Sequence, residues 1–244
     1  GEIVNKFDYI HELLADTSKA VVKDEKSWLS FLDTASYMFK YSFSDQLLIY
    51  AQRPDAKACA EFEYWNEKMN RWINKGAKGI ALIDDTGRFS RLRYVFDITD
   101  TRSSYNQELK LWSINESMYD DVIQSLSDTY DFLKNEQDLG HVYLLLAHMF
   151  VEENMSDYLQ QITKYNHNSS FEDMEEFEIK TICEGVLENS IAYCLMKRSN
   201  IQTSFYFEEG DFDGISFFDT FDMIGVLGTA NKDLTDMALT EIGK

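Results

Sequence analysis

Apolar residues recur every three to four positions through the first fifty residues, which is the spacing of one face of an α-helix. The pattern predicts helices over residues 5–20, 26–41 and 42–53. Pro54 ends the third, because proline cannot continue a helix and the residue before it avoids the helical conformation. A short fourth helix is expected over residues 59–70.

The period changes after residue 78. Residues 79–84 and 92–98 are rich in β-branched and aromatic side chains, and the polar sequence DDTGR between them predicts a hairpin loop. Further along, the pattern is helical again. The chain therefore predicts an α+β fold that is mostly helical, with a small antiparallel β-sheet in the N-terminal half and a helical acidic C-terminal half. The later helices are expected over residues 116–134, 141–160, 173–198 and 230–243, with an aromatic, glycine-punctuated loop at 203–220.

Charge is spread unevenly along the 244 residues, whose formal net charge is −20. Residues 1–110 hold 16 Lys and Arg against 17 Asp and Glu, a net of −1. Residues 111–244 hold 7 against 26, a net of −19. This change predicts a boundary near residue 113, which divides the chain into regions 1–113 and 114–244.

Within the first region, residues 68–102 carry a local charge of +4, from eight bases against four acids. Such a window can bind a polyanion despite the overall charge, because salt screens charges beyond about 8 Å. The alternative, which composition alone favours, is a surface on which bases and acids merely alternate. The bases are Lys68, Arg71, Lys75, Lys78, Arg88, Arg91, Arg93 and Arg102, and the acids are Asp84, Asp85, Asp97 and Asp100.

Two tryptophans, Trp65 and Trp72, lie among these bases. Aromatic side chains among cations suit single-stranded nucleic acid, because every base offers a face for stacking and the backbone needs positive partners. The alternative is that both tryptophans belong to the core, and we expect this of at least one.

A polar stripe of Asp45, Gln46, Gln52 and Arg53 follows one side of the third predicted helix. Ser42 and Asp45 fit a capping box, which accounts for Asp45 without any function. The remaining three could bond phosphates or base edges, as Gln and Arg on a helix surface often do. A solvated helix face is the alternative.

Catalytic and metal motifs are incomplete. The sequence HELLA, which begins at His11, has Ala15 in place of the second histidine of HExxH. The sequence EGDFDGISFFDT resembles a calcium loop but has Thr220 where a bidentate Glu is needed. No acid–base pair or nucleophile follows from spacing. We therefore expect no enzyme, no cofactor and no metal.

Three cysteines without a CxxC motif, an odd number, fit a reducing cytoplasm. The longest apolar run, residues 142–151, is too short to span a bilayer and contains His148. The start of the chain has no signal-peptide pattern. We therefore expect a cytoplasmic protein without membrane contact.

Residues 41–84, followed by LRYVFDITDTR at 92–102, resemble the N-terminal domain of ArdC-type antirestriction proteins. That domain also opens large conjugative-transposon proteins, including LtrC-like proteins and helicase–methylase fusions. The stretches ENSIAYCLMKRSNI and FDTFDMIGVLGTANKDLTDMALTEIGK resemble the helical continuation in the transposon branch. The residues that match the family pattern are Tyr41, Ser42, Gln46, Ile49, Gln52, Arg53, Pro54, Asp55, Trp65, Lys75, Gly76, Gly79, Val95, Phe96 and Asp97.

The resemblance implies a domain similar to single-stranded DNA-binding modules. ArdC proteins add a metallopeptidase-like domain with HExxH, which this chain lacks, so peptidase activity is not implied. The family's usual Asn is Asp45 here, and a carboxylate at that position repels phosphate. Because the chain stops within a predicted helix at TEIGK, we expect the natural protein to be longer, with any catalytic domain beyond residue 244.

We therefore predict a non-enzymatic N-terminal module of a conjugative-element protein that binds single-stranded DNA in transfer or antirestriction. The alternative is a protein-interaction or DNA-mimic module, whose acidic half binds a basic partner such as a restriction enzyme. The predicted DNA contacts are Gln46, Gln52, Arg53, Trp65, Lys68, Arg71, Trp72, Lys75, Lys78, Arg88, Arg91 and Arg93.

Overall fold

Three helices open the chain in the computed structural model, which describes residues 5–103, 109 and 111–243. They are α1 (Lys6–Val21), α2 (Glu25–Ala35) and α3 (Phe43–Gln52). Each begins at a side chain that accepts a hydrogen bond from a backbone N–H three residues on, which satisfies a donor that the helix leaves unpaired. These capping residues are Asn5, Asp24 and Ser42. The second helix ends six residues earlier than the sequence pattern predicted.

The strands form two small antiparallel sheets. The first has the order β1 (Cys59–Ala60), β4 (Arg91–Asp97), β3 (Ile80–Asp84). The second is a two-stranded ribbon of β2 (Arg71–Ile73) and β5 (Thr101–Ser103). The β3–β4 hairpin was predicted, whereas β1, β2 and β5 were not, because two or three residues are too few to show an alternating pattern.

The predicted fourth helix over residues 59–70 is wrong. Its place is taken by strand β1 and by a single π-helical turn, Tyr64–Lys68. This turn packs against β2.

Four longer helices make up the rest of the fold: α4 (Tyr119–Thr129), α5 (Leu139–Lys164), α6 (Glu176–Arg198) and α7 (Phe221–Ile242). The last begins nine residues before the predicted start, at a cap in which the Thr220 hydroxyl accepts from the Met223 N–H. The expectation of a mostly helical α+β fold, with a small antiparallel sheet in the N-terminal half, is confirmed. Within the described ranges, no helix is both long and apolar enough to cross a membrane.

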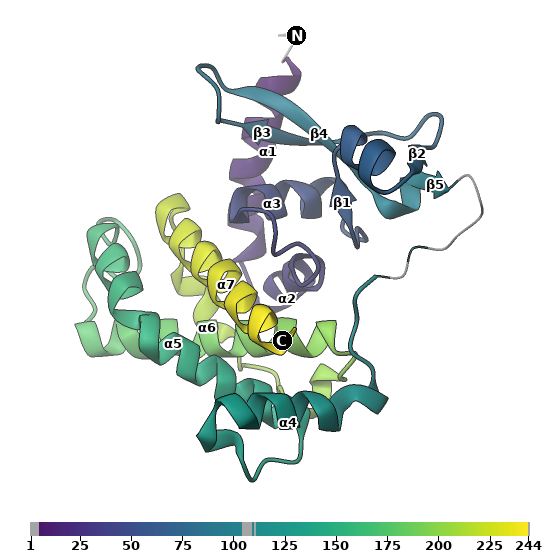
Figure 1. Cartoon of the computed structure of the whole chain (residues 1–244). Helices are drawn as coiled ribbons and strands as arrows, with labels where there is room; N and C mark the ends of the chain where they lie inside the picture. Colours follow the sequence, from purple (N-terminus) through teal and green to yellow (C-terminus); the bar gives the residue numbers. More distant parts are fainter. Residues whose placement is uncertain (1–4, 104–108, 110, 244) are drawn as a thin grey trace.

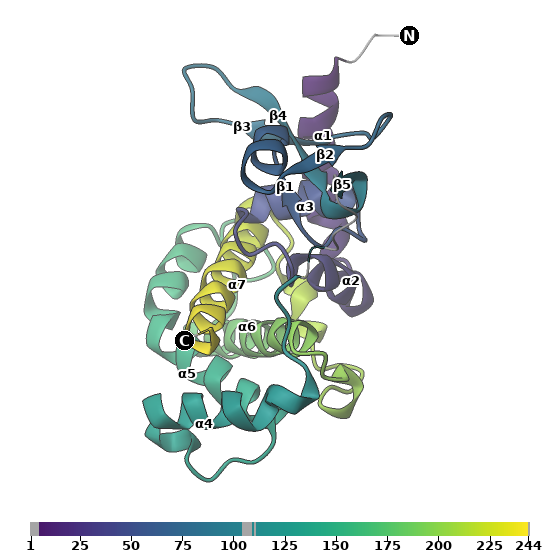
Figure 2. The same cartoon turned by 45° about the vertical axis from the view of Figure 1, so that its right-hand side comes forward.

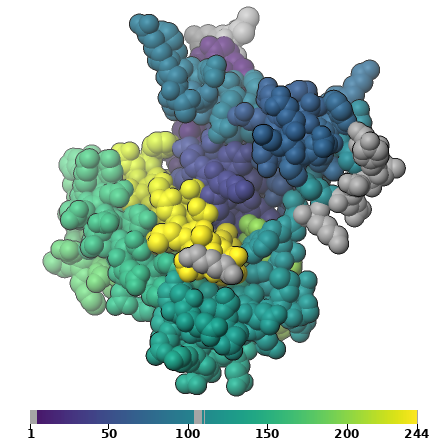
Figure 3. All heavy atoms as spheres, viewed as in Figure 1, coloured from purple at the N-terminus to yellow at the C-terminus, as the bar shows by residue number. Residues whose placement is uncertain are grey.

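Helices α1, α2 and α3 lie between the strands and helices α4 to α7 (Figures 1 and 2). On one side α1 and α3 contact β3, and on the other they contact α7, while α2 contacts α6. In the space-filling view, the β3–β4 hairpin extends from the body as a narrow arm (Figure 3).

The larger of two apolar cores draws on both sides of residue 113. Trp28 and Phe31 of α2 are buried in it together with residues of α5, α6 and α7. The Trp28 indole Nε1–H donates to the Ser190 hydroxyl of α6 at 2.8 Å. At the contact of α3 with α7, a Cβ added at Gly228 would lie 2.3 Å from the Phe43 ring. The change of charge balance near residue 113 therefore does not coincide with a division of the core.

The smaller core lies between the first sheet and the helices that cover it. Ile10 of α1 and Leu48 of α3 pack there with Ile80 and Val95, which face each other across β3 and β4. This small core positions β3 and β4, which carry Arg91 and Arg93 of the basic window.

Candidate nucleic-acid interface

The predicted polar stripe on α3 does not form a surface. The Gln46 side chain is only 1% exposed, and its Nε2 donates to the Met38 carbonyl at 2.9 Å. Asp45 is buried as well. The prediction that Gln46 contacts DNA is therefore wrong for this structure, because the helix turns that side chain into the fold.

Gln52 caps the open edge of the first sheet. Its Oε1 accepts from the Ala81 N–H at 3.0 Å, and its Nε2 donates to the Ala81 carbonyl at 2.9 Å. A side-chain amide thus replaces the strand that would otherwise pair with β3, and an unpaired edge is a site of aggregation. The amide of Gln52 is committed to the fold rather than to a ligand.

Arg53 and Arg93 form ion pairs within the protein. Arg53 reaches Asp100 at 2.7 Å and also Asp55, which ties the end of α3 to the turn before β5. Arg93 bridges Asp45 at 2.8 Å and Glu61 at 3.1 Å. Because these carboxylates already neutralise them, neither arginine is a strong candidate for phosphate.

Asp45 stands where the family that the sequence resembles has Asn, and its surroundings explain how a carboxylate is accommodated. Ser42 caps α3 as predicted, by accepting from the Asp45 N–H at 3.2 Å. Burial raises the pKa of the Asp45 carboxyl group, although the Arg93 guanidinium favours the charged form. The side chain points into the fold, so it does not repel a bound strand by direct contact.

The two tryptophans have different surroundings. Trp65 is 2% exposed, and its Nε1–H donates to the Phe96 carbonyl at 2.8 Å, so it belongs to the packed interior. The prediction that Trp65 stacks on a base is wrong for this structure. Trp72 is 48% exposed on β2. Trp65 is therefore the tryptophan that belongs to the core, as expected of at least one, and Trp72 remains the candidate for stacking on a base.

Trp72 lies directly opposite Arg102 in the β2–β5 ribbon. Side chains that are opposite each other in an antiparallel pair project from the same face. Arg71, the preceding residue of β2, projects from the other face, where its Nε donates to the Thr101 hydroxyl at 2.7 Å. Arg102 is exposed, and its Nη1 donates to the Asn74 side chain at 3.3 Å. An aromatic ring and a guanidinium therefore share one exposed face.

Three lysines surround this ribbon. Lys68 ends the π-helical turn, while Lys75 and Lys78 lie in the loop from β2 to β3. Gly76, with φ +85°, allows that loop to turn in a conformation that L side chains rarely adopt. All three lysines are exposed, and no carboxylate of residues 5–103 or 111–243 lies within ion-pair distance of them. Trp72, Arg71, Arg102, Lys68, Lys75 and Lys78 are called the ribbon site below.

The other two predicted bases lie elsewhere. Arg91 pairs with Asp84 at 3.2 Å, and the Arg88 guanidinium lies 5.5 Å from the centre of the Phe89 ring. Both are at the tip of the β3–β4 hairpin, at the end of β4 away from the ribbon (Figures 1 and 2). The basic window of the sequence is thus divided between two places.

Two exposed aromatic residues near the strands were not among the predicted contacts. Phe89 is 76% exposed in the hairpin loop, and Tyr94 is half-exposed on β4. A Cβ at Gly79 would lie 3.0 Å from the Tyr94 Cβ, so the glycine makes room for this side chain. An apolar residue within the polar sequence DDTGRFS was a signal that could have identified Phe89.

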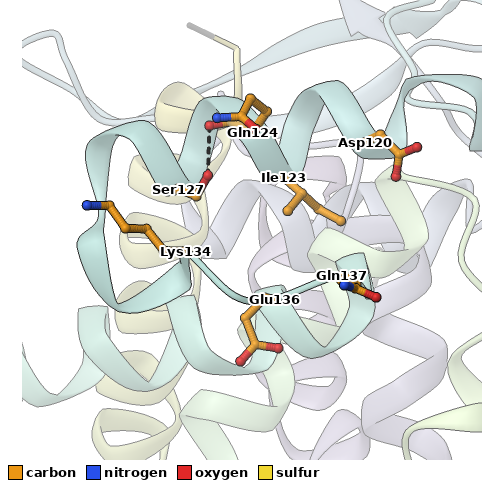
Figure 4. A pocket seen from close by; sticks show the side chains of 7 residues that line it. All are labelled: Asp120, Ile123, Gln124, Ser127, Lys134, Glu136 and Gln137. Atoms are coloured by element: carbon orange, nitrogen blue, oxygen red, sulfur yellow. Dashed lines mark hydrogen bonds between the residues drawn. The ribbon is translucent and has the colours of Figure 1, made fainter.

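A pocket of about 380 Å³ lies away from the strands, between α4 and the segment that leads to α5 (Figure 4). Lys134 there pairs with Asp131 at 2.5 Å, and Glu136 faces His141 at 3.7 Å. Ligand sites are mostly apolar with a few polar groups, whereas this lining is mostly polar. It is lined by Asp120, Ile123, Gln124, Ser127, Lys134, Glu136 and Gln137.

No group of three His, Cys, Asp or Glu side chains that could hold a metal occurs in the part of the chain that the structure describes. Comparison with models of protein families, with curated proteins and with solved structures finds no match. The resemblance to the ArdC N-terminal domain therefore stays a prediction.

Proposed function

We propose that this chain binds single-stranded DNA through the ribbon site. The observation that carries the proposal is the exposed Trp72 opposite Arg102, with lysines beside it that have no carboxylate partner among the described residues. An aromatic platform next to exposed cations suits a strand with unpaired bases, because the ring stacks on a base while the cations hold phosphates. The module acts by binding rather than by catalysis.

The biological setting follows from the resemblance. In a conjugative-element protein of the ArdC or LtrC-like kind, a module of this type would hold the transferred strand, either for transfer or for evasion of restriction. We further propose a cytoplasmic location, since the cysteines Cys59, Cys183 and Cys194 are all free thiols.

The test is fluorescence anisotropy with a labelled single-stranded 20-mer and its duplex, across a salt series. The single strand is expected to bind more tightly. Replacing Lys75 and Lys78 together by Gln is expected to lower the salt slope by about 1.4, since each phosphate contact contributes about 0.7. Trp72→Ala is expected to weaken binding by about 1–3 kcal/mol with the slope unchanged.

The matched control replaces two exposed lysines of the acidic half, Lys134 and Lys180, by Gln, which changes the net charge by the same amount. This control is expected to leave the slope as it is. If the wild-type chain fails to bind the single strand even at low salt, the proposed function is wrong.

A second candidate function rests on the acidic half. Every carboxylate of residues 111–243 is at least partly exposed, and Phe177, 79% exposed, lies between Glu176 and Glu178 in α6. Such a surface fits a basic protein partner, or a DNA-binding enzyme whose channel it occupies in place of DNA. The test is whether the chain inhibits a restriction endonuclease. Inhibition would favour this candidate if excess DNA overcomes it and if the double variant Glu176→Gln, Glu178→Gln inhibits less.

A further inference from the structure

The tip of the β3–β4 hairpin presents an aromatic ring to solvent. Phe89 is 76% exposed and belongs to neither apolar core. Its contact with Arg88 is a guanidinium 5.5 Å from the ring centre, which leaves most of the ring accessible. The packing of the fold therefore does not use this side chain, and its ring is accessible to a ligand.

The turn itself is well defined by its hydrogen bonds. The Asp84 carboxylate accepts from the Thr86 N–H at 3.0 Å and pairs with Arg91 at 3.2 Å. The Ser90 hydroxyl donates to the Asp85 carboxylate. These contacts close the hairpin across its base, so Phe89 is carried on an ordered arm that extends beyond the helices (Figure 3).

Charge distinguishes the tip from the ribbon site. At the tip, Arg88 and Arg91 are balanced by Asp84 and Asp85, whereas the ribbon site is basic. A neutral tip with an exposed ring does not attract phosphates, but it can stack on a base, since stacking needs no charge.

We propose that Phe89 stacks on a base of the same DNA strand that the ribbon site holds, so that hairpin tip and ribbon are the two ends of one binding track. This inference rests on the proposed function. The tip and the ribbon lie at opposite ends of β4, whose seven residues span about 20 Å. At about 3.4 Å per stacked nucleotide, a strand needs roughly six nucleotides to reach both. Tyr94, half-exposed on β4, lies between them along the strand.

The experiment measures the affinity of single-stranded oligonucleotides of 4, 6, 8, 12 and 20 nucleotides for the wild-type chain and for Phe89→Ala. For the wild type, affinity is expected to rise steeply once the length passes about six nucleotides. Phe89→Ala is expected to bind the 4-mer like the wild type and the 20-mer about 5- to 100-fold more weakly, with the same salt slope, because a stacking contact and not a phosphate contact is lost.

Phe205→Ala is the matched control, since that phenylalanine is 79% exposed but lies in the short turn Thr203–Phe205 between α6 and α7. It is expected to bind every length as the wild type does. The inference is overturned if Phe89→Ala binds the 20-mer as tightly as the wild type, or if it weakens the 4-mer and the 20-mer equally. If the wild type binds no length, the proposed function itself fails, so the two failures are distinguishable.

Discussion

Charged side chains are used in opposite ways in the two parts of this molecule. In helices α4 to α7 every carboxylate is at least partly exposed, and a large apolar core holds the helices together. Around the small sheet, by contrast, charged groups belong to the interior. Asp97 is fully buried and accepts hydrogen bonds from the backbone N–H groups of Lys57, Ala58 and Thr99.

The difference follows from the amount of apolar surface each part can bury. The short strands and the few residues between them form only a small core, so hydrogen bonds to buried side chains position the loops there. Polar residues near the sheet are therefore weak indicators of a binding site. Those that bind a ligand are better sought among the exposed residues without internal partners.

The largest expected effect comes from a change in the larger apolar core, to which residues on both sides of residue 113 contribute. Trp28→Ala removes a fully buried indole and its hydrogen bond to Ser190, and it should lower the free energy of unfolding by about 3–5 kcal/mol. Urea denaturation should still give a single transition, because α2 packs against α3 on one side of residue 113 and against α6 on the other. Trp28→Phe, which keeps most of the volume, should cost less.

The control for this prediction is Phe177→Ala, which removes an exposed ring and should change the free energy of unfolding by less than about 0.5 kcal/mol. Two separate transitions, only one of which Trp28→Ala shifts, would contradict a shared core and would restore the boundary near residue 113.

A smaller effect is expected at the edge of the first sheet. Gln52→Ala removes the amide that pairs with Ala81 and leaves that backbone N–H and carbonyl without their partner. The free energy of unfolding should fall by about 1–3 kcal/mol. Light scattering should also show more aggregation, since the β3 edge becomes open.

DNA affinity decides between the two interpretations of Gln52. If Gln52 has only a structural role, folded Gln52→Ala should bind the single strand as tightly as the wild type does. Gln124→Ala, at an exposed position of α4, serves as the control and should change neither quantity. Unchanged stability together with weaker DNA binding would restore the polar stripe as a contact surface.

The smallest effect is expected from a surface contact between α5 and α6. The hydrogen bond that the His148 ring donates to the Glu188 carboxylate, together with the charge of that carboxylate, raises the pKa of His148, and Glu152 lies 3.5 Å from the same ring. Because the folded-state pKa is raised, this contribution to stability is fully present below the unfolded pKa of about 6.5 and is lost as the pH rises through the folded pKa. The side chain is more than half exposed, so we expect less than about 1 kcal/mol.

The measurement is urea denaturation of the wild type and of His148→Gln between pH 5.5 and pH 8.5. The difference in the free energy of unfolding between the two proteins should shrink as the pH rises. Phe177→Ala, which removes an exposed ring and no ionisable group, should keep the wild-type pH dependence. A difference that grows with pH would contradict the prediction, because it would mean that protonated His148 lowers the free energy of unfolding.

The sequence by itself determined most of the helices and the β3–β4 hairpin, because helical spacing, caps and hairpin loops are local signals. Ser42 was recognised as a cap from residues three positions apart. The start of α7 was missed because Gly225 and Gly228 weaken the helical signal of that segment. Only the packing of Phe43 against Gly228 gives the second glycine a reason to be there.

The candidate site was decided by the tertiary structure. Helical spacing groups Gln46, Gln52 and Arg53, but it does not say what each side chain meets. Here Gln46 bonds the segment between α2 and α3, Gln52 the edge of the sheet and Arg53 the turn before β5. Likewise Trp65 and Trp72 are equivalent in sequence until one packs against β4 and the other projects from the ribbon. Burial and pairing depend on residues dozens of positions away, so local patterns identify the elements of this protein but not which of their faces remain exposed to a ligand.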